Sequence, residues 1–381
     1  MDRRSFLVGT GIALSQLLAG CGGQNQAKLR VQLLKGSIPV QVVNKFRTLT
    51  QHADLQFAPV EQLQDLFTQL QSWKQDKKAD EPQFKLPLPF IKSKQIAKSD
   101  LVTLGDYWLA QAIEQKLIQP LDPAKLQQWL ALPSRWQELV RRNAQGQLDA
   151  GGKVWAAPYR WGNTVIAYNK DKFKSLGWTP TDWSDLWREE LRDHISLLEQ
   201  PREVIGLTLK KLGQSYNTKN LNNVSDLEKQ LRALHQQVKL YSSDTYLQPL
   251  ILGDTWLAVG WSTDVLRVMQ SYQQIAAVVP QSGTALWADL WVRPTGSVSS
   301  TSLEEQWIDF CWTPQIAQQI SLQTKATAPI PVTLKPADLP EPLKLLLSDP
   351  EIFQRSEFLL PLSKTTMQQY QSLWRTIRIN T

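Results

Sequence analysis

The sequence predicts an α/β protein made of two lobes, and three observations indicate this class. The chain has 381 residues, enough for about two domains at roughly 100–200 residues each. Hydrophobic residues make up 42% and charged residues 20%, which is typical of a folded globular protein and excludes disordered, collagen-like and coiled-coil chains. Short apolar segments alternate along the chain with segments of helical spacing, as in an α/β sheet protein.

The first 27 residues are predicted to direct export. A basic start with Arg3 and Arg4 precedes a short apolar run, which is typical of a signal peptide and is too interrupted to span a membrane. The Arg pair resembles a twin-arginine export signal, and Leu18 to Cys21 (LAGC) resembles a bacterial lipobox. That resemblance implies removal of residues 1–20, acylation of Cys21, and a tether over 21–27. The alternative is an ordinary signal peptide with an incidental cysteine.

The first half of the folded body contains four predicted elements. Residues 28–34 alternate in polarity and predict a strand, and apolar residues at helical spacing over 59–73 predict a helix. Residues 74–99 are rich in Lys, Gln and Pro and are expected to form a surface excursion. A short strand over 100–104 and a helix over about 107–116 follow.

The second half continues the alternation. Strands are expected over 164–168, 255–259, 275–279 and 287–294, and a helix over 363–377. A further helix near 303–311 is introduced by Thr301 and Glu304 at capping-box spacing, and its Cys311 is expected to be a buried structural thiol. The acidic pairs at 189–190 and 304–305 are interpreted as solvated helix faces.

Several kinds of chemistry are missing from the sequence. It has no phosphate-binding glycine loop, no Gly-x-Ser-x-Gly nucleophile motif and no His-Glu-x-x-His zinc motif. Its three histidines are far apart, so no metal site or cofactor is expected. The net charge of +7 is spread along the chain without a nucleic-acid motif. The sequence therefore contains no visible nucleophile-base set for an exported enzyme, and we expect no nucleic-acid partner.

Several motifs together resemble the extracellular solute-binding proteins of ABC transporters, in the spermidine/putrescine-binding branch. The matching segments are 158–173 (PYRWGNTVIAYNKDKF), 200–204 (QPREV), 243–244 (SD), 260–262 (GWS) and 286–289 (LWAD). The resemblance covers most of 28–377. It implies a type II periplasmic-binding-protein-like fold, in which two α/β lobes joined by crossing strands hold a ligand between them.

The resemblance also places the lobes along the chain. Crossing strands would fall near 161–168 and 287–292, with lobe 1 formed by 28–162 and 288–325, and lobe 2 by 163–287 and 326–381. The alternative is that both segments are central strands of one large sheet.

A polyamine needs carboxylates at intervals and flat aromatic faces along its methylenes. The resemblance assigns ligand contact to a set of acids and aromatic residues: Trp261, Trp287, Asp289, Glu203, Tyr107, Asp106 and Trp161. These assignments have plainer alternatives. Trp261 and Trp287 could belong to the hydrophobic core, Glu203 could interact with a helix dipole, and Asp289 could cap a strand end. For Asp106 we favour the alternative, in which it N-caps its helix.

The sequence also departs from the family pattern. Residues 35–39 lack the acid and aromatic of the family's first loop, Gln200 replaces a carboxylate, and 358–360 replaces a polar contact. The predicted site thus keeps Glu203 and Asp289, with Asp106 as a possible third acid, enough for a diamine or one end of a triamine. A less cationic ligand is also possible.

The predicted function is that of a monomeric, lipid-anchored substrate-binding protein on the periplasmic side of a bacterial membrane. It would capture a small organic cation, such as putrescine or spermidine, and deliver it to an ABC permease. The alternative is a membrane-tethered accessory protein that keeps the fold but binds a non-polyamine solute or none. A ferric-ion binder is disfavoured because the eight tyrosines include no adjacent pair.

Overall fold

The computed structural model describes residues 28–51, 53–79, 98–297, 302–347 and 349–379. The predicted signal peptide, the lipobox with Cys21, the tether, and most of the predicted excursion over 74–99 lie outside these ranges. Among the described residues, no helix combines the length and the apolar character that crossing a membrane requires.

The strands vary in length, and two of them are much longer than the rest. The strands are β1 (Lys28–Leu34), β2 (Asp54–Val60), β3 (Leu101–Gly105), β4 (Ile118–Gln119), β5 (Arg141–Arg142), β6 (Lys153–Val154), β7 (Ala157–Asn169), β8 (Ile195–Leu197), β9 (Val238–Tyr241), β10 (Leu257–Trp261), β11 (Ile275–Val278), β12 (Ala285–Pro294) and β13 (Glu357–Phe358).

Helices connect most of these strands, as expected for an α/β protein. The α-helices are α1 (Val40–Leu49), α2 (Leu63–Ala79), α3 (Asp106–Glu114), α4 (Ser134–Val140), α5 (Lys170–Leu176), α6 (Pro201–Lys211), α7 (Leu227–His235), α8 (Gln248–Leu252), α9 (Ser262–Ser271), α10 (Leu303–Cys311), α11 (Pro314–Thr324), α12 (Pro350–Arg355) and α13 (Lys364–Ile379). Short 3-10 helices lie at Pro123–Lys125, Trp129–Ala131, Trp183–Trp187, Glu189–Leu191, Leu221–Asn223, Pro336–Asp338 and Glu341–Leu346.

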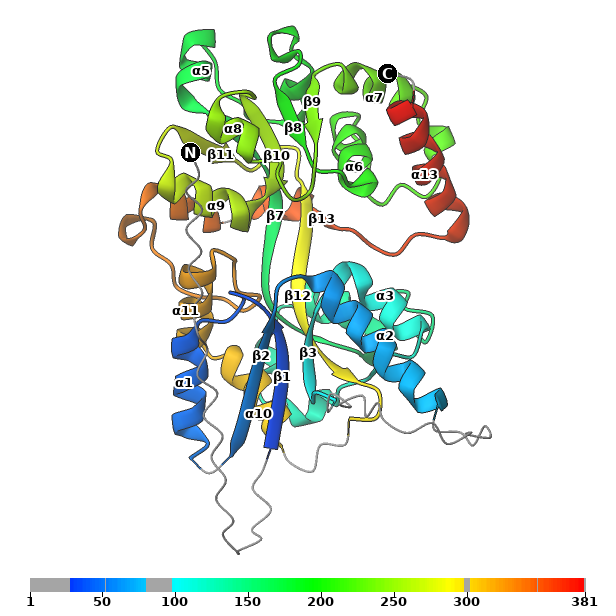
Figure 1. Ribbon diagram of the computed structural model, residues 1–381, viewed down its shortest axis with the longest axis vertical. Helices are drawn as coiled ribbons and strands as arrows, with labels where there is room; N and C mark the ends of the chain where they lie inside the picture. The colour runs from blue at the N-terminus through cyan, green and yellow to red at the C-terminus, as the bar shows by residue number, and fades with distance from the viewer. Residues whose placement is uncertain (1–27, 52, 80–97, 298–301, 348, 380–381) are drawn as a thin grey trace, which may run out of the picture.

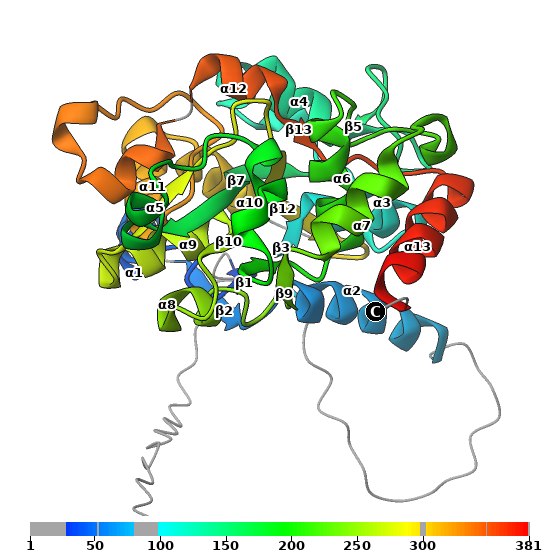
Figure 2. The same ribbon diagram turned by 90° about the horizontal axis from the view of Figure 1, so that it is seen from above.

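The two long strands β7 and β12 cross between two lobes (Figure 1). In the first lobe the strand order is β2-β1-β3-β12-β7, with β12 antiparallel to both β3 and β7. Beyond the crossing, β7 pairs with β10 and β11, and the order continues through β8 to β9. Viewed along the long axis, helices lie on both sides of the crossing strands (Figure 2). The predicted two-lobed α/β fold is confirmed.

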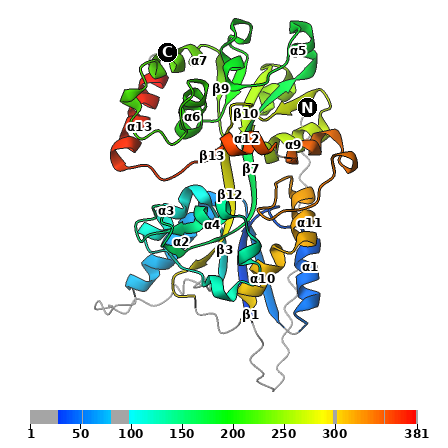
Figure 3. The same ribbon diagram turned by 180° about the vertical axis from the view of Figure 1, so that it is seen from behind.

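The hydrophobic core is divided at the crossing strands. One cluster of buried side chains includes Trp161 and Leu286, whereas the next includes Ile166 and Ala285. Helix α12 and strand β13 lie at the level of the junction (Figure 3), and β13 pairs with the start of β12. The predicted lobe boundaries stay a prediction. Residues Ala328 and Ile330, which it assigns to lobe 2, pack in the cluster of the first lobe.

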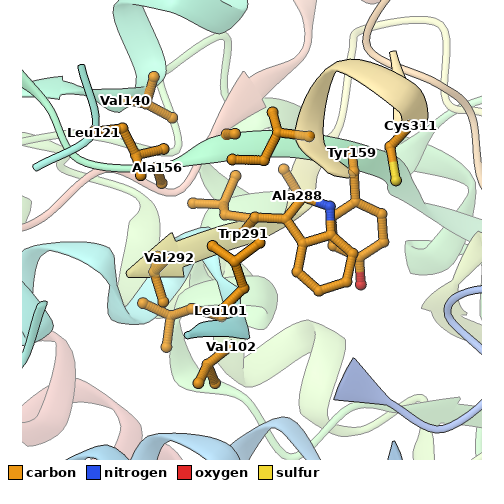
Figure 4. Packing of buried hydrophobic residues seen from close by; sticks show 14 of the residues in the cluster. Leu101, Val102, Leu121, Val140, Ala156, Tyr159, Ala288, Trp291, Val292 and Cys311 are labelled. Atoms are coloured by element: carbon orange, nitrogen blue, oxygen red, sulfur yellow. The ribbon is translucent and has the colours of Figure 1, made fainter. Parts of the chain in front are cut away.

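A tight aromatic stack stabilises the core of the first lobe (Figure 4). The rings of Tyr159 and Trp291 stack with centroids 4.2 Å apart, and the Cys311 side chain lies beside them in the figure. Cys311 is buried, and burial raises the pKa of its thiol. The prediction of a buried structural thiol is confirmed, because a thiol in this state is a poor nucleophile.

Two predictions for helix α10 are wrong. Its N-cap is Ser302, which makes no side-chain capping bond, and Thr301 lies outside the described residues. Glu304 is fully buried instead of solvated, and it forms an ion pair with Arg293, which also pairs with Glu305 at 2.8 Å. The arginine stands at the end of β12, so these acids connect the helix to the sheet.

Candidate functional site

Asp106 lies at the junction of the lobes, at the first position of α3. Gly105 is the N-cap of this helix, so the predicted capping role of Asp106 is wrong. Its carboxylate instead accepts a 2.9 Å hydrogen bond from the backbone N–H of Ala288 in β12. The side chain is buried and forms no ion pair among the described residues, and burial raises its pKa to about 7.

Glu203 is a second buried acid, in the first turn of α6. Both of its oxygens accept from the hydroxyl of Thr164 in β7, at 3.1 Å. Burial, with a smaller contribution from the nearby charge of Asp106, raises the pKa of Glu203 to about 7 against the opposing effects of Thr164 and Arg202. Because Asp106 packs on β12 in the first lobe and Glu203 begins a helix of the second, the two acids face the junction from opposite sides.

Asp289 does not offer a free carboxylate. Its oxygen Oδ2 accepts from Nε of Arg160 at 2.7 Å and lies 2.6 Å from Nη2, and both side chains are at least 95% buried. Burial opposes the charge on Arg160, but the carboxylate outweighs it and raises the pKa of the guanidinium. The residue sits within β12, opposite Arg160 in the β7 register, so a strand-end capping role is also wrong.

The indole of Trp287 packs on the crossing strand β7 at Gly162, which leaves room for it because it has no side chain. A Cβ atom added at Gly162 would lie 2.3 Å from Cζ2 of the indole and 2.6 Å from Oγ of Ser262 in α9. The indole is partly exposed, and its Nε1 is buried without a hydrogen-bond partner among the described residues. The Arg160 guanidinium carbon lies 5.9 Å from the ring centroid.

Trp261 ends strand β10 on the second-lobe side of the junction. Its indole is partly exposed and lies near enough to Glu203 to lower the pKa of that acid. The rings of Tyr246 and Trp261 meet edge-on with their centroids 6.1 Å apart. The Tyr246 ring also fills the space beside Gly260, where an added Cβ would lie 1.8 Å from it. Packing against Tyr246 therefore fixes the position of Trp261.

The two remaining aromatic candidates lie in different surroundings. Tyr107 is 46% exposed at the start of α3 and meets the ring of Trp108 edge-on. Trp161 is buried in the first-lobe core, and its indole N–H donates to the carbonyl of Ala328 at 2.9 Å. It packs against Trp136, so the structure places Trp161 in the core, and the assignment of ligand contact to this residue stays a prediction.

The structure therefore brings Asp106, Glu203, Trp261, Trp287 and the Asp289 pair to the junction. Sequence reasoning missed Arg160, although this residue lies inside one of the quoted motifs. An arginine in an otherwise apolar strand is a signal that a buried acid must lie opposite, but the strand register is needed to name that acid. Among the described residues, no cluster of three His, Cys, Asp or Glu side chains could hold a metal ion.

Two lobes joined by long crossing strands, with acids and indoles at the seam, are an architecture typical of proteins that close around a small solute. Residues 97–348 match the model of the family described as bacterial extracellular solute-binding protein. The chain belongs to this family.

Similar proteins fall in the same group. The chain is 26% identical to the spermidine/putrescine-binding periplasmic protein of Salmonella typhimurium over 222 residues, which is 58% of this chain and 61% of that protein's length. It is 26% identical to the putrescine/cadaverine-binding protein of Pseudomonas aeruginosa over 63% of this chain and 72% of that one. A solved spermidine/putrescine ABC transporter substrate-binding protein from Streptococcus pneumoniae shares the fold, with a TM-score of 0.76, 21% identity, and coverage of 93% and 99%.

Proposed function

We propose that this protein is the solute-capturing component of an ABC importer, that it binds a small organic cation of the polyamine class between its lobes, and that it has no catalytic role. The names of the Salmonella and Pseudomonas relatives support this class of solute. It would release the cation to a membrane permease. The observation that carries the proposal is the pair Asp106 and Glu203.

These two acids are the feature that calls for a cation. Each is buried, neither has an ion-pair partner among the described residues, and burial raises the pKa of both to about 7. An ammonium group placed between them would favour their charged forms, because an opposite charge within a few ångströms stabilises a carboxylate. The indoles of Trp261 and Trp287 would cover the methylene groups next to that ammonium.

A thermal-shift series tests the proposal. The chain is titrated with putrescine, spermidine, 4-aminobutyrate, a neutral sugar and a dicarboxylate. A ligand at 100 times its Kd stabilises the folded state by about 2.7 kcal/mol, so a binding amine raises the melting temperature while the sugar and the dicarboxylate do not. Stabilisation by the sugar or the dicarboxylate, with none by any amine, would reject a cation-binding function and leave only the family.

We further propose that Cys21 carries lipid and holds the protein at the periplasmic side of a membrane. The sequence LAGC at 18–21 supports this, since a lipobox cysteine becomes the acylated first residue. In a bacterial host, Cys21→Ser should leave the chain unprocessed or release it from the membrane fraction. Mass spectrometry of the mature terminus checks this, and an unmodified terminus at another residue contradicts it.

A further inference from the structure

We infer that the proposed ligand site at the junction of the lobes has a second end built to bind a hydrogen-bond acceptor, and that Arg160 and Trp287 form it. The ligand would then be an amine that carries a carboxylate or a carbonyl at its other end. This inference rests on the proposed function, because it keeps the amine at Asp106 and Glu203. It adds that Arg160 determines which amines are accepted.

Two donor groups at the junction lack an acceptor. Nη1 of Arg160 and Nε1 of Trp287 are both buried, and neither has a hydrogen-bond partner among the described residues. The guanidinium carbon lies 5.9 Å from the centroid of the indole, so the two groups share one place. Arginine and the indole N–H can only donate, and a buried donor without a partner is unfavourable. What is missing at this place is therefore an acceptor.

Within the described parts of the chain, no acceptor makes a hydrogen bond of normal geometry with Nη1 of Arg160. The Asp289 carboxylate bonds to the Nε and Nη2 side of the guanidinium through Oδ2. The Tyr159 phenol lies near Arg160, and its charge and hydrogen bonding help to raise the pKa of the guanidinium, but its oxygen is shared with the hydroxyl of Thr103 at 3.1 Å and makes no hydrogen bond of normal geometry with Nη1. Nη1 is left for a group that enters from outside.

The guanidinium of Arg160 lies where the lobes meet. Arg160 pairs with Asp289 next to β3 of the first lobe, while its charge also lowers the pKa of Asp264 in α9 of the second lobe against the larger effect of burial. Helix α9 reaches the first lobe elsewhere too, because a Cβ added at Gly36 would lie 3.9 Å from Nη2 of Arg267. A solute held between the lobes would therefore meet the guanidinium.

The charges at the junction favour the same class of ligand. Arg160 and Asp289 neutralise each other, which leaves Asp106 and Glu203 as the acids available to the solute. Both titrate near neutral pH, and Arg142 and Arg202 lie near them as additional cations. One ammonium group suits this balance. A second ammonium at the far end of the ligand would meet the positive charge of Arg160 and the N–H donor of Trp287, and it would find no acceptor in either.

Calorimetry with three ligands of nearly equal length tests the inference. Putrescine has two ammonium ends, 4-aminobutyrate replaces one with a carboxylate, and N-acetylputrescine replaces one with a neutral amide. We expect the full-length protein to bind at least one of the two acceptor-bearing amines about tenfold or more tightly than putrescine. The amide and the carboxylate arms distinguish a neutral acceptor from an anionic one.

Two variants assign the preference to Arg160. Arg160→Met removes the donor and frees Asp289, so the acceptor-bearing amine should lose about tenfold or more in affinity while putrescine gains. Because a freed buried acid can destabilise the fold, the double variant Arg160→Met with Asp289→Asn removes both charges; it should lose the acceptor-bearing amine without the gain for putrescine. The half-exposed Arg188→Met is the control and should change neither affinity.

The outcomes separate the two claims. If putrescine binds more tightly than both acceptor-bearing amines, or if Arg160→Met leaves the order of affinities unchanged in a folded protein, the inference is rejected and the proposed function stands. If no amine binds to the unaltered protein, including spermidine, both are rejected.

Discussion

A carboxylate removed from water stays charged only when a cation or several donors replace the lost hydration. Both oxygens of Glu203 accept from one hydroxyl, that of Thr164, and Trp261 and the charge of Arg202 lower its pKa by less than burial raises it. Asp106 accepts from backbone N–H groups and forms no ion pair among the described residues, and the nearby charge of Arg142 lowers its pKa by less than burial raises it. Asp289 differs, since Arg160 supplies its counter-charge. The three acids at the junction are therefore not equivalent, and a cationic solute gains most from the first two.

The first prediction concerns these two acids. Glu203→Gln and Asp106→Asn should each weaken binding of an amine ligand by roughly 2–5 kcal/mol, because each removes one charge from a desolvated pair. Isothermal calorimetry measures the affinity, and the exposed Glu190→Gln is the control that should leave it unchanged. Unaltered affinity in both site variants, with normal melting curves, would show that the amine lies elsewhere.

The residue types of the site could be predicted from the sequence, but their partners could not. The acid at 289 and the arginine at 160 are 129 positions apart, and only the pairing of β12 with β7 places them opposite each other. The same holds for Asp106, whose acceptor role depends on the backbone of Ala288, 182 positions away. Partner choice is a property of strand register, which motifs do not encode.

At the scale of elements, α6 is held in place by close backbone packing, and this position directs Glu203 toward the junction. Gly206 faces the ring of Tyr216, and a Cβ there would lie 2.0 Å from that ring. The hydroxyl of Tyr370 in α13 lies within 3.1 Å of the carbonyl of Tyr216. The C-terminal helix therefore supports the helix that carries a site residue.

A second prediction follows for this packing. Gly206→Ala should lower the free energy of unfolding by about 1–3 kcal/mol, because a methyl group would be forced into a filled core. It should also weaken amine binding by displacing Glu203. Chemical denaturation and calorimetry measure the two effects. Gly151→Ala is the matched control, since its Cβ would lie at an ordinary 3.6 Å from the Asp149 carboxylate. Equal stability of the two variants would contradict the packing argument.

The order of elements could largely be read from the sequence, and the errors have a tertiary cause. The strand at 28–34 and the helix near 107–116 were placed within two residues of β1 and α3. The helix expected over 59–73 begins only at Leu63, because Pro59 and Val60 pair with β1 as the end of β2. Strand pairing with a distant segment outweighed local helical spacing at this point.

At the scale of the whole molecule, the two raised pKa values connect proton binding to lobe closure. Their ordinary values are 3.8 for Asp106 and 4.5 for Glu203, and burial raises each to about 7. Between about pH 4 and 7 the buried groups hold protons that hydrated carboxylates would release. We expect opening of the lobes to hydrate both acids. The form in which they are buried is then favoured fully below about pH 4, and this preference is lost as the pH rises through 7, at about 1.4 kcal/mol per group and pH unit.

The third prediction is that the ligand-free protein opens as the pH is raised from about 5 to about 8, since charged acids seek water. Small-angle scattering should show a larger radius of gyration at the higher pH, and a bound amine should reverse the change. The double variant Asp106→Asn with Glu203→Gln should show little dependence on pH. A radius of gyration that is constant over this range, or that falls with rising pH, would refute the connection.

The absence of a side chain at Gly162 allows Trp287 and Ser262 to pack directly on β7 at the junction of the lobes. Trp287 and Ser262 lie where any side chain at this position would have to go, and Ser262 belongs to the second lobe. Gly162→Ala would therefore displace the indole of Trp287 and keep Ser262, with its helix α9, farther from β7, while the two acids Asp106 and Glu203 remain. We expect this variant to bind its solute more weakly and to release it faster. A permease that recognises only the form with the lobes together would not respond to this variant.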